Sequence, residues 1–500
     1  MTSFSDLQEF FNSKKMNMII ASDAEPRVHT IKNGKIVIKN SAGGVAVALD
    51  PIAQATNATF IARAKSEEEK KTVDKSGFIA INGQYGNYTL KKLFFEKEDV
   101  DNYYYGFSNQ TLWPMCHVAF EEPTWNDDWF ESYKKINKEY ANAIKKSLVS
   151  NKTNFVWIND YQLALVPHYL GKPKNTIIAM FWHIPWPTWE IFRILPYKKE
   201  ILTSLLGCDF LAFHRGYQAR NFIQTVEREL QTRVDDETQK VYFNKYSTIV
   251  RNLPMGIDVD VIKNSVEKEE TNDGILKEVV KNTLGIKNNS SDPLDNYFEK
   301  YKVMLGVSRL DYTKGIKYRF KAIDKFFEEN KKYIGKATYL AIIAPSREPI
   351  PSYQRVKKQA FDLAEEINKK YQTKDWKPIN IIYQVFDRKD IINFYHKADV
   401  CIVTPVDDGM NLVSKEFVVA SSLSQNPGML VLSQFAGSAI DLTSALIVNP
   451  YDIKEAAVAI KTALEMPKKE KIQRTNKMIS LLEENNIYEW GLEFIRQASS

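Results

Sequence analysis

Cysteine is scarce in this 500-residue sequence, which contains only Cys116, Cys208 and Cys401. The three residues lie far apart, and their spacing matches neither a disulfide framework nor a zinc site. The 6 histidines show no metal-ligand spacing either. We therefore expect no disulfide, no bound metal and no cofactor.

Long hydrophobic runs are also missing. No run reaches the roughly 18 apolar residues that a membrane-spanning helix needs. The first 15 residues alternate apolar and polar side chains and lack the apolar core of a secretory signal peptide. Glycosylation-like triplets such as Asn87–Thr89 are then chance matches. These observations predict a cytoplasmic protein that does not bind a membrane.

Several nucleotide and nucleophile motifs are absent. The sequence has no GxGxxG segment, no Walker A segment and no nucleophile elbow, so a dehydrogenase or a kinase lacks its main support. The 68 basic and 62 acidic residues are interspersed and leave a net charge of +6 without a dense basic stripe. This pattern argues against a nucleic-acid partner and favours small anionic ligands.

Short apolar runs alternate with helical patterns along most of the chain, and 500 residues are too many for one core. Runs of strand length occur at 16–22, 155–158, 177–182, 210–213, 247–250, 303–307, 339–344, 381–385, 400–403 and 429–432. A polar stretch at 282–297 separates two series and is interpreted as a surface insertion or a flexible connection. Helical segments at 453–466 and 470–499 end the chain. The pattern predicts an α/β protein with two parallel sheets.

The segment Cys401–Ala420 has the most informative pattern. An apolar strand breaks at Pro405, a polar turn contains Asp408 and Gly409, and a helix with Glu416 follows. The free N–H groups at a helix start favour an anion such as a phosphate, and glycine lets the backbone approach it closely. Asp408 and Glu416 could then flank a polyhydroxylated ligand. An ordinary strand–helix unit with a solvated acidic turn gives the same pattern.

Other polar residues follow the strand-like runs directly. Arg309 and Lys314 come after one such run. By themselves they would fit a solvated loop, but beside the Asp408–Glu416 segment we expect them to bind a diphosphate. Asp160 and His183 follow two others. Because ligands bind at the carboxyl ends of parallel strands, two sheets facing each other across a cleft would suit an enzyme that joins two polar molecules.

Six ordered motifs together resemble the trehalose-6-phosphate synthase family, from about residue 17 to the C-terminus. They are Ser41–Gly44, Asn159–Tyr161, His183–Pro187, Arg309–Gly315, Asp408–Val413 and Gln434–Gly437. The resemblance implies a GT-B fold, with two Rossmann-like domains at 1–255 and 256–480 and a last helix, 481–500, crossing back to the first. It also implies metal-independent, anomer-retaining transfer of glucose from a nucleotide-glucose to glucose 6-phosphate.

The resemblance also implies residue roles. Catalysis would fall to Arg309 and Lys314 at the donor diphosphate, with His183 at the donor glucose and Asp160 beside the acceptor. The acceptor phosphate would be held by Tyr105, Trp113 and Arg347. The donor would be bound by Gly44, Asp408, Gly409, Met410, Asn411, Leu412, Val413 and Glu416. The expected partners are these small molecules, and a homo-oligomer is left open.

The departures from the family pattern concentrate on the acceptor side. Ala24 stands where the family has an arginine, Asn159 where it has a histidine and Asp407 where it has an arginine, and the tryptophan-rich segment near Phe60–Arg63 is replaced. Arg27 or Arg63 could restore the charge lost at position 24. Two alternatives therefore stay open. One is a different phosphorylated acceptor, such as glycerol 3-phosphate, and the other is a non-catalytic sugar-phosphate sensor.

Overall fold

The computed structural model describes residues 2–32, 35–40, 44–267 and 293–500. It divides into two compact units, Met1–Gly256 with Asn485–Ser500, and Ile257–Glu484. The sequence placed these borders at 255/256 and 480/481. None of the described helices is long and apolar enough to cross a membrane.

The first unit is built on a ten-stranded sheet of order β10-β11-β12-β9-β8-β7-β1-β4-β6-β5. The strands from β12 to β6 are parallel, and the two edges are antiparallel hairpins. The strands are β1 (Asn17–Ala21), β4 (Thr59–Arg63), β5 (Phe78–Asn82), β6 (Asn87–Leu93), β7 (Asn154–Asn159), β8 (Thr176–Phe181), β9 (Phe210–Phe213), β10 (Arg233–Asp235), β11 (Lys240–Phe243) and β12 (Tyr246–Asn252). A separate hairpin joins β2 (Arg27–Lys32) to β3 (Lys35–Asn40).

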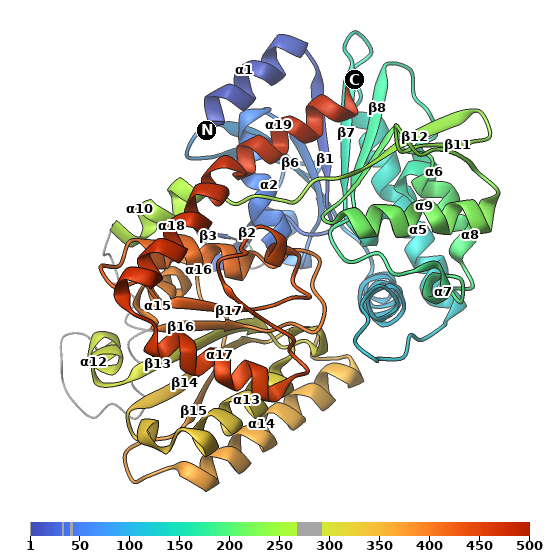
Figure 1. Ribbon diagram of the computed structural model, residues 1–500. Helices are drawn as coiled ribbons and strands as arrows, with labels where there is room; N and C mark the ends of the chain where they lie inside the picture. The colour runs from blue at the N-terminus through green and yellow to red at the C-terminus, as the bar shows by residue number, and fades with distance from the viewer. Residues whose placement is uncertain (1, 33–34, 41–43, 268–292) are drawn as a thin grey trace. The chain divides into compact units, whose positions relative to one another are not determined.

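Two groups of helices pack in this unit (Figure 1). One group comprises α1 (Phe4–Lys14), α2 (Gly44–Ala55) and α19 (Ile487–Ala498). The other comprises α5 (Asp127–Ser147), α6 (Val166–Leu170), α7 (Trp189–Phe192), α8 (Lys198–Leu205) and α9 (Gly216–Leu230), and α3 (Lys97–Val100), η2 (Asp101–Leu112) and α4 (Trp113–Cys116) lead into it. Although α19 is last in sequence, its Phe494 stacks on Trp157 of β7 at 4.0 Å between ring centroids. The aromatic face of α19 is therefore part of this unit's core.

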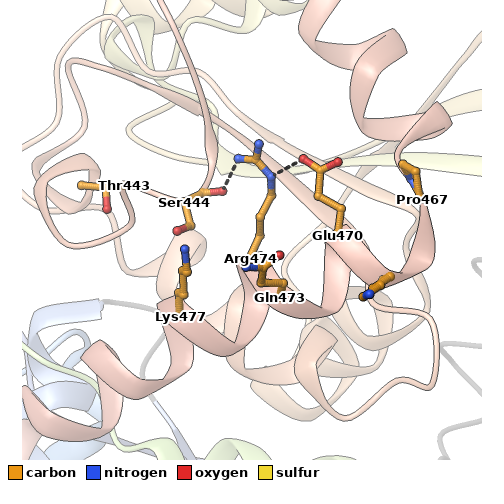
Figure 2. Close-up of a pocket in the computed structure, with 8 residues that line it drawn as sticks. Thr443, Ser444, Pro467, Glu470, Gln473, Arg474 and Lys477 are labelled. Atoms are coloured by element: carbon orange, nitrogen blue, oxygen red, sulfur yellow. Dashed lines mark hydrogen bonds and ion pairs between the residues drawn. The ribbon is translucent and has the colours of Figure 1, made fainter.

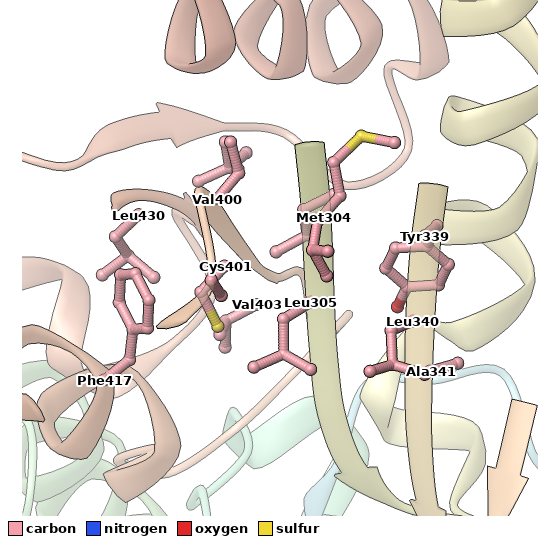
Figure 3. Packing of buried hydrophobic residues seen from close by; sticks show 14 of the residues in the cluster. Met304, Leu305, Tyr339, Leu340, Ala341, Val400, Cys401, Val403, Phe417 and Leu430 are labelled. Atoms are coloured by element: carbon pink, nitrogen blue, oxygen red, sulfur yellow. The ribbon is translucent and has the colours of Figure 1, made fainter. Parts of the chain in front are cut away.

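The second unit is built on an entirely parallel six-stranded sheet of order β15-β14-β13-β16-β17-β18. The strands are β13 (Lys302–Arg309), β14 (Ala337–Ala344), β15 (Ile379–Tyr383), β16 (Val400–Val403), β17 (Met429–Ser433) and β18 (Leu446–Val448). The helices are α10 (Val259–Glu267), α12 (Pro293–Lys300), α13 (Ile316–Glu329), α14 (Pro351–Tyr371), α15 (Arg388–Lys397), α16 (Leu412–Ser422), α17 (Ile453–Glu465) and α18 (Lys468–Glu484). Figure 3 shows part of the apolar core, with Leu305, Cys401 and Phe417 among its buried side chains.

The predicted strand runs are confirmed to within a few residues, and the α/β class with two parallel sheets is confirmed. Two other predictions were wrong. Residues 282–292 of the stretch predicted as an insertion at 282–297 lie outside the described residues, and residues 293–297 belong to α12, where Leu294 and Tyr297 are buried because their spacing puts them on one helix face. The single helix predicted at 470–499 is two helices, since Asn486 caps α19 by accepting hydrogen bonds from two backbone N–H groups.

Candidate functional site

Two loops at the carboxyl edge of the second unit's sheet are joined by backbone hydrogen bonds. One follows β16 and contains Asp408, and the other follows β17 and contains Gly437. The Gly437 N–H donates to the Asp408 carbonyl at 3.0 Å, and the Ser438 N–H donates to the Met410 carbonyl at 2.6 Å. A Cβ on Gly437 would lie 2.0 Å from the Gly409 carbonyl oxygen, so only glycine permits this approach. The motifs at 408–413 and 434–437 therefore form one structure.

Lys314 and Asp408 meet at this edge. The Lys314 Nζ lies 2.7 Å from Asp408 Oδ2, and both side chains are 14% exposed. Asn411 donates to the same carboxylate oxygen at 2.9 Å. The Asn411 side chain also accepts from the Ser414 N–H at 3.0 Å and so caps α16. The predicted diphosphate lysine and the predicted glucose carboxylate thus lie in one cluster.

Arg319 holds the loop that carries Lys314 in place. No role was predicted for this arginine from the sequence. Arg319 is buried, and its guanidinium donates to the Lys314 carbonyl at 3.0 Å and to the Ile402 carbonyl at 3.1 Å. Gly315 has a φ of +66°, and a Cβ there would lie 2.0 Å from the Thr404 carbonyl oxygen. An arginine on an amphipathic helix usually belongs to the solvated face, so the sequence held no signal for this contact.

Arg347 lies in a buried cluster with Asp311 and Tyr353. Its Nη1 is 3.3 Å from Asp311 Oδ2, and the Tyr353 hydroxyl is 3.1 Å from the same oxygen. Burial alone would raise the pKa of Asp311, but Arg347, then Arg309 and Lys314, outweigh it and hold that pKa below its ordinary value. The cluster ties Arg347 to the loop that contains Arg309 and Lys314. The ion pair between Arg347 and Asp311 is buried and not on the surface.

Glu416 has a different partner from Asp408. It lies on α16 and pairs with Arg388 of α15 at 2.8 Å. The other predicted donor residues surround the start of the same helix: Gly409 and Met410 are buried, and Leu412 and Val413 are half-buried. Gly44 is the exposed first residue of α2 in the first unit, and Ser41–Gly43 lie outside the described residues.

Asp160 and His183 are brought together at the carboxyl ends of β7 and β8. Asp160 Oδ1 accepts hydrogen bonds from the Tyr161 N–H at 3.0 Å and the His183 N–H at 3.2 Å. Asp160 has a φ of +73° and a ψ of 166°, a conformation that is costly for any residue except glycine. Burial, and then His214, lower the pKa of His183 well below its ordinary value, so the ring is neutral.

Both arginines proposed to replace the missing charge at position 24 already have carboxylate partners. Arg63, the last residue of β4, makes two bonds of 2.9 Å to Asp23. The Tyr103 hydroxyl donates to the same carboxylate at 3.0 Å. Arg27 pairs with Asp50 at 3.1 Å. The charge of each arginine is thus balanced within the first unit.

The predicted acceptor aromatics lie on and beside η2, a π-helical segment. Trp113 is buried and packs against His117 in a tilted arrangement, at 4.1 Å between ring centroids. Tyr105 is half-buried and meets Tyr104 edge-on at 5.2 Å. Trp113 also lies 5.8 Å from the ring of Tyr161, the residue after Asp160. Trp113 is thereby placed near Asp160, whereas Arg347 belongs to the other unit.

A separate pocket of about 540 Å³ opens beside α18 (Figure 2). Arg474 crosses it, bonded to Glu470 at 2.8 Å and to the Ser444 carbonyl at 3.2 Å. Ser444 precedes β18, so this pocket lies at the amino end of that strand, away from the edge with Lys314. Among the described residues, no group of three or more His, Cys, Asp or Glu is placed to hold a metal ion.

Comparison with known proteins shows a match over almost the whole chain. The profile of Glycosyltransferase family 20 matches residues 15–500. A trehalose-6-phosphate synthase of Klebsiella pneumoniae is 36% identical over 82% of this chain and 82% of its own. A UDP-forming alpha,alpha-trehalose-phosphate synthase of Dictyostelium discoideum is 30% identical over 96% of this chain, which spans 62% of that relative.

Solved structures agree with this match. An Escherichia coli structure bound with UDP-2-fluoro glucose has a TM-score of 0.82 at 29% identity and covers 96% of this chain and 98% of its own. A UDP-forming alpha,alpha-trehalose-phosphate synthase of Burkholderia xenovorans in complex with glucose-6-phosphate also has a TM-score of 0.82 at 29% identity, covering 97% and 100%. The predicted GT-B fold class is confirmed. Since the family match also contains all six motifs, this chain belongs to glycosyltransferase family 20, the trehalose-6-phosphate synthase family.

Proposed function

We propose that this protein transfers glucose from UDP-glucose to glucose 6-phosphate, with retention at the anomeric carbon, and so makes trehalose 6-phosphate. The observation that carries the proposal is the Lys314–Asp408–Asn411 cluster at the start of α16, in a chain of this family. UDP is proposed as the nucleotide because relatives are named UDP-forming and the E. coli structure holds a UDP-glucose analogue.

The donor is assigned to the carboxyl edge of the second unit's sheet. Arg309, Lys314 and the N-terminus of α16 supply positive charge for a diphosphate. In the reaction the bond from the anomeric carbon to the diphosphate oxygen breaks, and negative charge grows on the leaving group. Preorganised cations aimed at that charge lower the barrier. Asp408 is assigned to a glucose hydroxyl, and Glu416 to the ribose.

Retention follows if the acceptor hydroxyl attacks on the face that the diphosphate leaves. The leaving phosphate oxygen takes the hydroxyl proton as the new bond to the anomeric carbon forms. No protein nucleophile is required. The roles of Lys314 and Arg309 are to hold the leaving group and neutralise it.

The acceptor phosphate is assigned to Arg63 with Tyr105 and Trp113. Arg63 uses Nε and Nη2 for Asp23, and its Nη1 has no hydrogen-bond partner among the described residues. A guanidinium held in this way can still donate to a phosphate through its free edge. Arg347, assigned to the same phosphate from the resemblance, is engaged by Asp311 and Tyr353.

A second candidate is the same transfer to another phosphorylated acceptor, such as glycerol 3-phosphate. Two observations favour it: Ala24 replaces an arginine, and both neighbouring arginines are already paired with carboxylates. A sugar-phosphate sensor is less favoured because the donor cluster would then serve no purpose. The cytoplasmic location and the homo-oligomer stay predictions.

The test is a matrix of substrates. Purified protein is incubated with UDP-, GDP- and ADP-glucose against glucose 6-phosphate, glycerol 3-phosphate and unphosphorylated glucose, and the products are identified by mass spectrometry and NMR. We expect trehalose 6-phosphate from UDP-glucose and glucose 6-phosphate. Preferred transfer to glycerol 3-phosphate would select the second candidate, and transfer to glucose without preference for its phosphate would refute both.

The same assay identifies the residue whose positive charge binds the acceptor phosphate. Arg63→Ala should raise the Michaelis constant for glucose 6-phosphate at least tenfold and leave that for UDP-glucose nearly unchanged, because a charge-assisted bond to phosphate is lost. Arg27→Ala is the matched control, since Arg27 also pairs with a carboxylate but projects from the β2–β3 hairpin. Equal effects of the two variants would contradict the assignment to Arg63.

A further inference from the structure

A buried side-chain pair joins the ends of β7 and β8. Asn159 is the last residue of β7, and His183 lies two residues after β8. Asn159 Oδ1 is 3.1 Å from His183 Nε2, and both side chains are buried. The family pattern stated above has a histidine where this chain has Asn159.

The neighbours of Asn159 determine which way its amide points. Its Nδ2 lies 3.3 Å from the Ala21 carbonyl oxygen and 3.3 Å from the Trp157 carbonyl oxygen. Carbonyl oxygens only accept hydrogen bonds, so the amide nitrogen must face them and the amide oxygen must face His183. Because an amide oxygen only accepts as well, His183 Nε2 must carry the hydrogen.

The other ring nitrogen is then an acceptor. His183 packs against Phe181 at 4.5 Å and lies 5.4 Å from His214 between ring centroids, and it is neutral for the reason given above. A neutral imidazole with its hydrogen on Nε2 has a lone pair on Nδ1. Nδ1 is buried and has no hydrogen-bond partner in the described structure. Leaving a buried acceptor unpaired is unfavourable, and a hydrogen bond from a ligand hydroxyl would remove that cost.

We propose that Asn159 is a positioning residue that fixes His183 as a hydrogen-bond acceptor at Nδ1, where it receives the hydrogen of a hydroxyl group of the donor glucose. A histidine at position 159 would leave this direction open, since an imidazole nitrogen can donate or accept. The identity of the sugar rests on the proposed function, whereas the tautomer of His183 does not.

The tautomer is measured directly on the whole protein. Nitrogen-15 NMR of the histidine-labelled chain without substrate, between pH 6 and pH 8, should show His183 as the neutral Nε2–H form. His183→Phe identifies the signal by its loss. A neutral Nδ1–H form or an imidazolium in this range would overturn the proposal, whatever the enzyme's activity.

Asn159→Asp tests the positioning role. A carboxylate beside Nε2 should stabilise the doubly protonated ring, so Nδ1 would become a donor. We expect imidazolium signals for His183 at pH 6, kcat/KM for UDP-glucose reduced at least tenfold, KM for the acceptor unchanged, and partial recovery as pH rises and the ring loses its proton. His214 and Asp160 are the other titratable groups beside this ring, and both are unchanged in the variant.

Asn137→Asp is the matched control. Asn137 is buried in the same unit, and its side chain bonds only backbone groups: it accepts from the Leu165 N–H at 3.0 Å and donates to the Tyr133 and Gln162 carbonyls. Asn137→Asp should leave the His183 signals unchanged. An Asn159→Asp protein with wild-type His183 signals, or equal changes in both variants, would refute the role of Asn159.

Substrate analogues test the direction of the bond. Fluorine can accept a hydrogen bond but cannot donate one. At the hydroxyl that meets His183, the deoxyfluoro donor should therefore react as poorly as the deoxy donor, about tenfold or more below UDP-glucose. A deoxyfluoro donor that restores the rate lost by the deoxy donor at this position would show that Nδ1 donates. If no glucose donor reacts, the proposed function fails and the NMR result still stands.

Discussion

At the scale of single residues, Lys314 forms an ion pair with Asp408 and is also assigned to the leaving diphosphate. We predict that Lys314→Ala and Arg309→Ala each lower turnover about a hundredfold or more, because each removes a cation aimed at charge that grows in the transition state. Initial rates at saturating substrate measure this effect, with circular dichroism to verify folding.

Lys317→Ala is the control for these two variants. Lys317 lies on the first turn of α13, three residues after Lys314, and is exposed. Its removal changes the net charge by the same amount and should leave turnover near the wild-type value. A well-folded Lys314→Ala protein with near-normal turnover would refute the assignment of the donor site.

Asp160 combines a functional side chain with an unfavourable backbone. Its φ of +73° with a ψ of 166° belongs to a region that residues with a Cβ occupy at a cost of about 1–3 kcal/mol. We predict that Asp160→Gly is more stable than Asp160→Ala by about 1 kcal/mol or more, because both lose the carboxylate but only glycine relieves the strain. Urea unfolding followed by tryptophan fluorescence measures the difference.

Both Asp160 variants should be severely impaired in transfer, since the carboxylate that binds the His183 backbone is gone. Equal stabilities for the glycine and alanine variants would mean that the backbone stores no strain here. Wild-type rates in either variant would mean that Asp160 does not take part in the reaction.

At the scale of secondary-structure elements, a buried charge cluster links the start of β2 to β6 and to the 3-10 turn η1 (Glu67–Thr72). Lys92 of β6 pairs with Glu25 at 3.0 Å and also with Glu69, and His29 of β2 is buried beside them. Burial, despite Lys92, raises the pKa of Glu25 to about 7. Burial, then Lys92, lowers the pKa of His29 to about 4.

These two pKa shifts have opposite effects on the stability of the fold as the pH rises. Between pH 4.5 and pH 7 the folded protein binds more protons at Glu25 than the unfolded chain does, so raising pH destabilises the fold there. Between pH 4 and pH 6.5 the folded protein binds fewer protons at His29, so raising pH stabilises the fold. Over the shared range the contributions largely cancel.

Removing one of the two groups should leave the pH dependence that the other group causes. We predict that from pH 5 to pH 6.5 the melting temperature of His29→Gln, which keeps Glu25, falls relative to wild type. The melting temperature of Glu25→Gln, which keeps His29, should rise relative to wild type over the same range. Thermal melts at a series of pH values in the same buffers give both slopes. Parallel curves for wild type and both variants would show that this cluster does not titrate in the range.

At the scale of the whole molecule, the proposed function takes the positive charge for the donor from the protein itself, through Arg309, Lys314 and the N-terminus of α16. We therefore predict that excess chelator leaves most of the transfer activity, because side chains neutralise the leaving diphosphate where other transferases use a divalent ion. Assays with and without EDTA measure this. Complete loss that magnesium or manganese restores would contradict it.

Much of the architecture could be predicted because contiguous stretches of the sequence determine most of the strands and helices. Apolar runs such as Val400–Val403 and Phe210–Phe213 are buried on both faces of a parallel sheet, so they are continuous and easily recognised. The antiparallel edge strands β5, β10 and β11 are partly exposed and mix polar with apolar residues, and they were missed. The parallel strands β4, β6 and β18 were missed as well. The break between α18 and α19 was missed because one asparagine makes it.

The sequence by itself determined the fold class, the family and the positions of the loops proposed to bind the donor, since each of these motifs is a contiguous segment directly after a strand. Only the tertiary structure decided how the charges are paired. Lys314 and Asp408 are separated by 94 residues, and Asp23 and Arg63 by 40. Parallel strands bring such distant residues to the same sheet edge, and no local pattern of side chains records which of them will meet there.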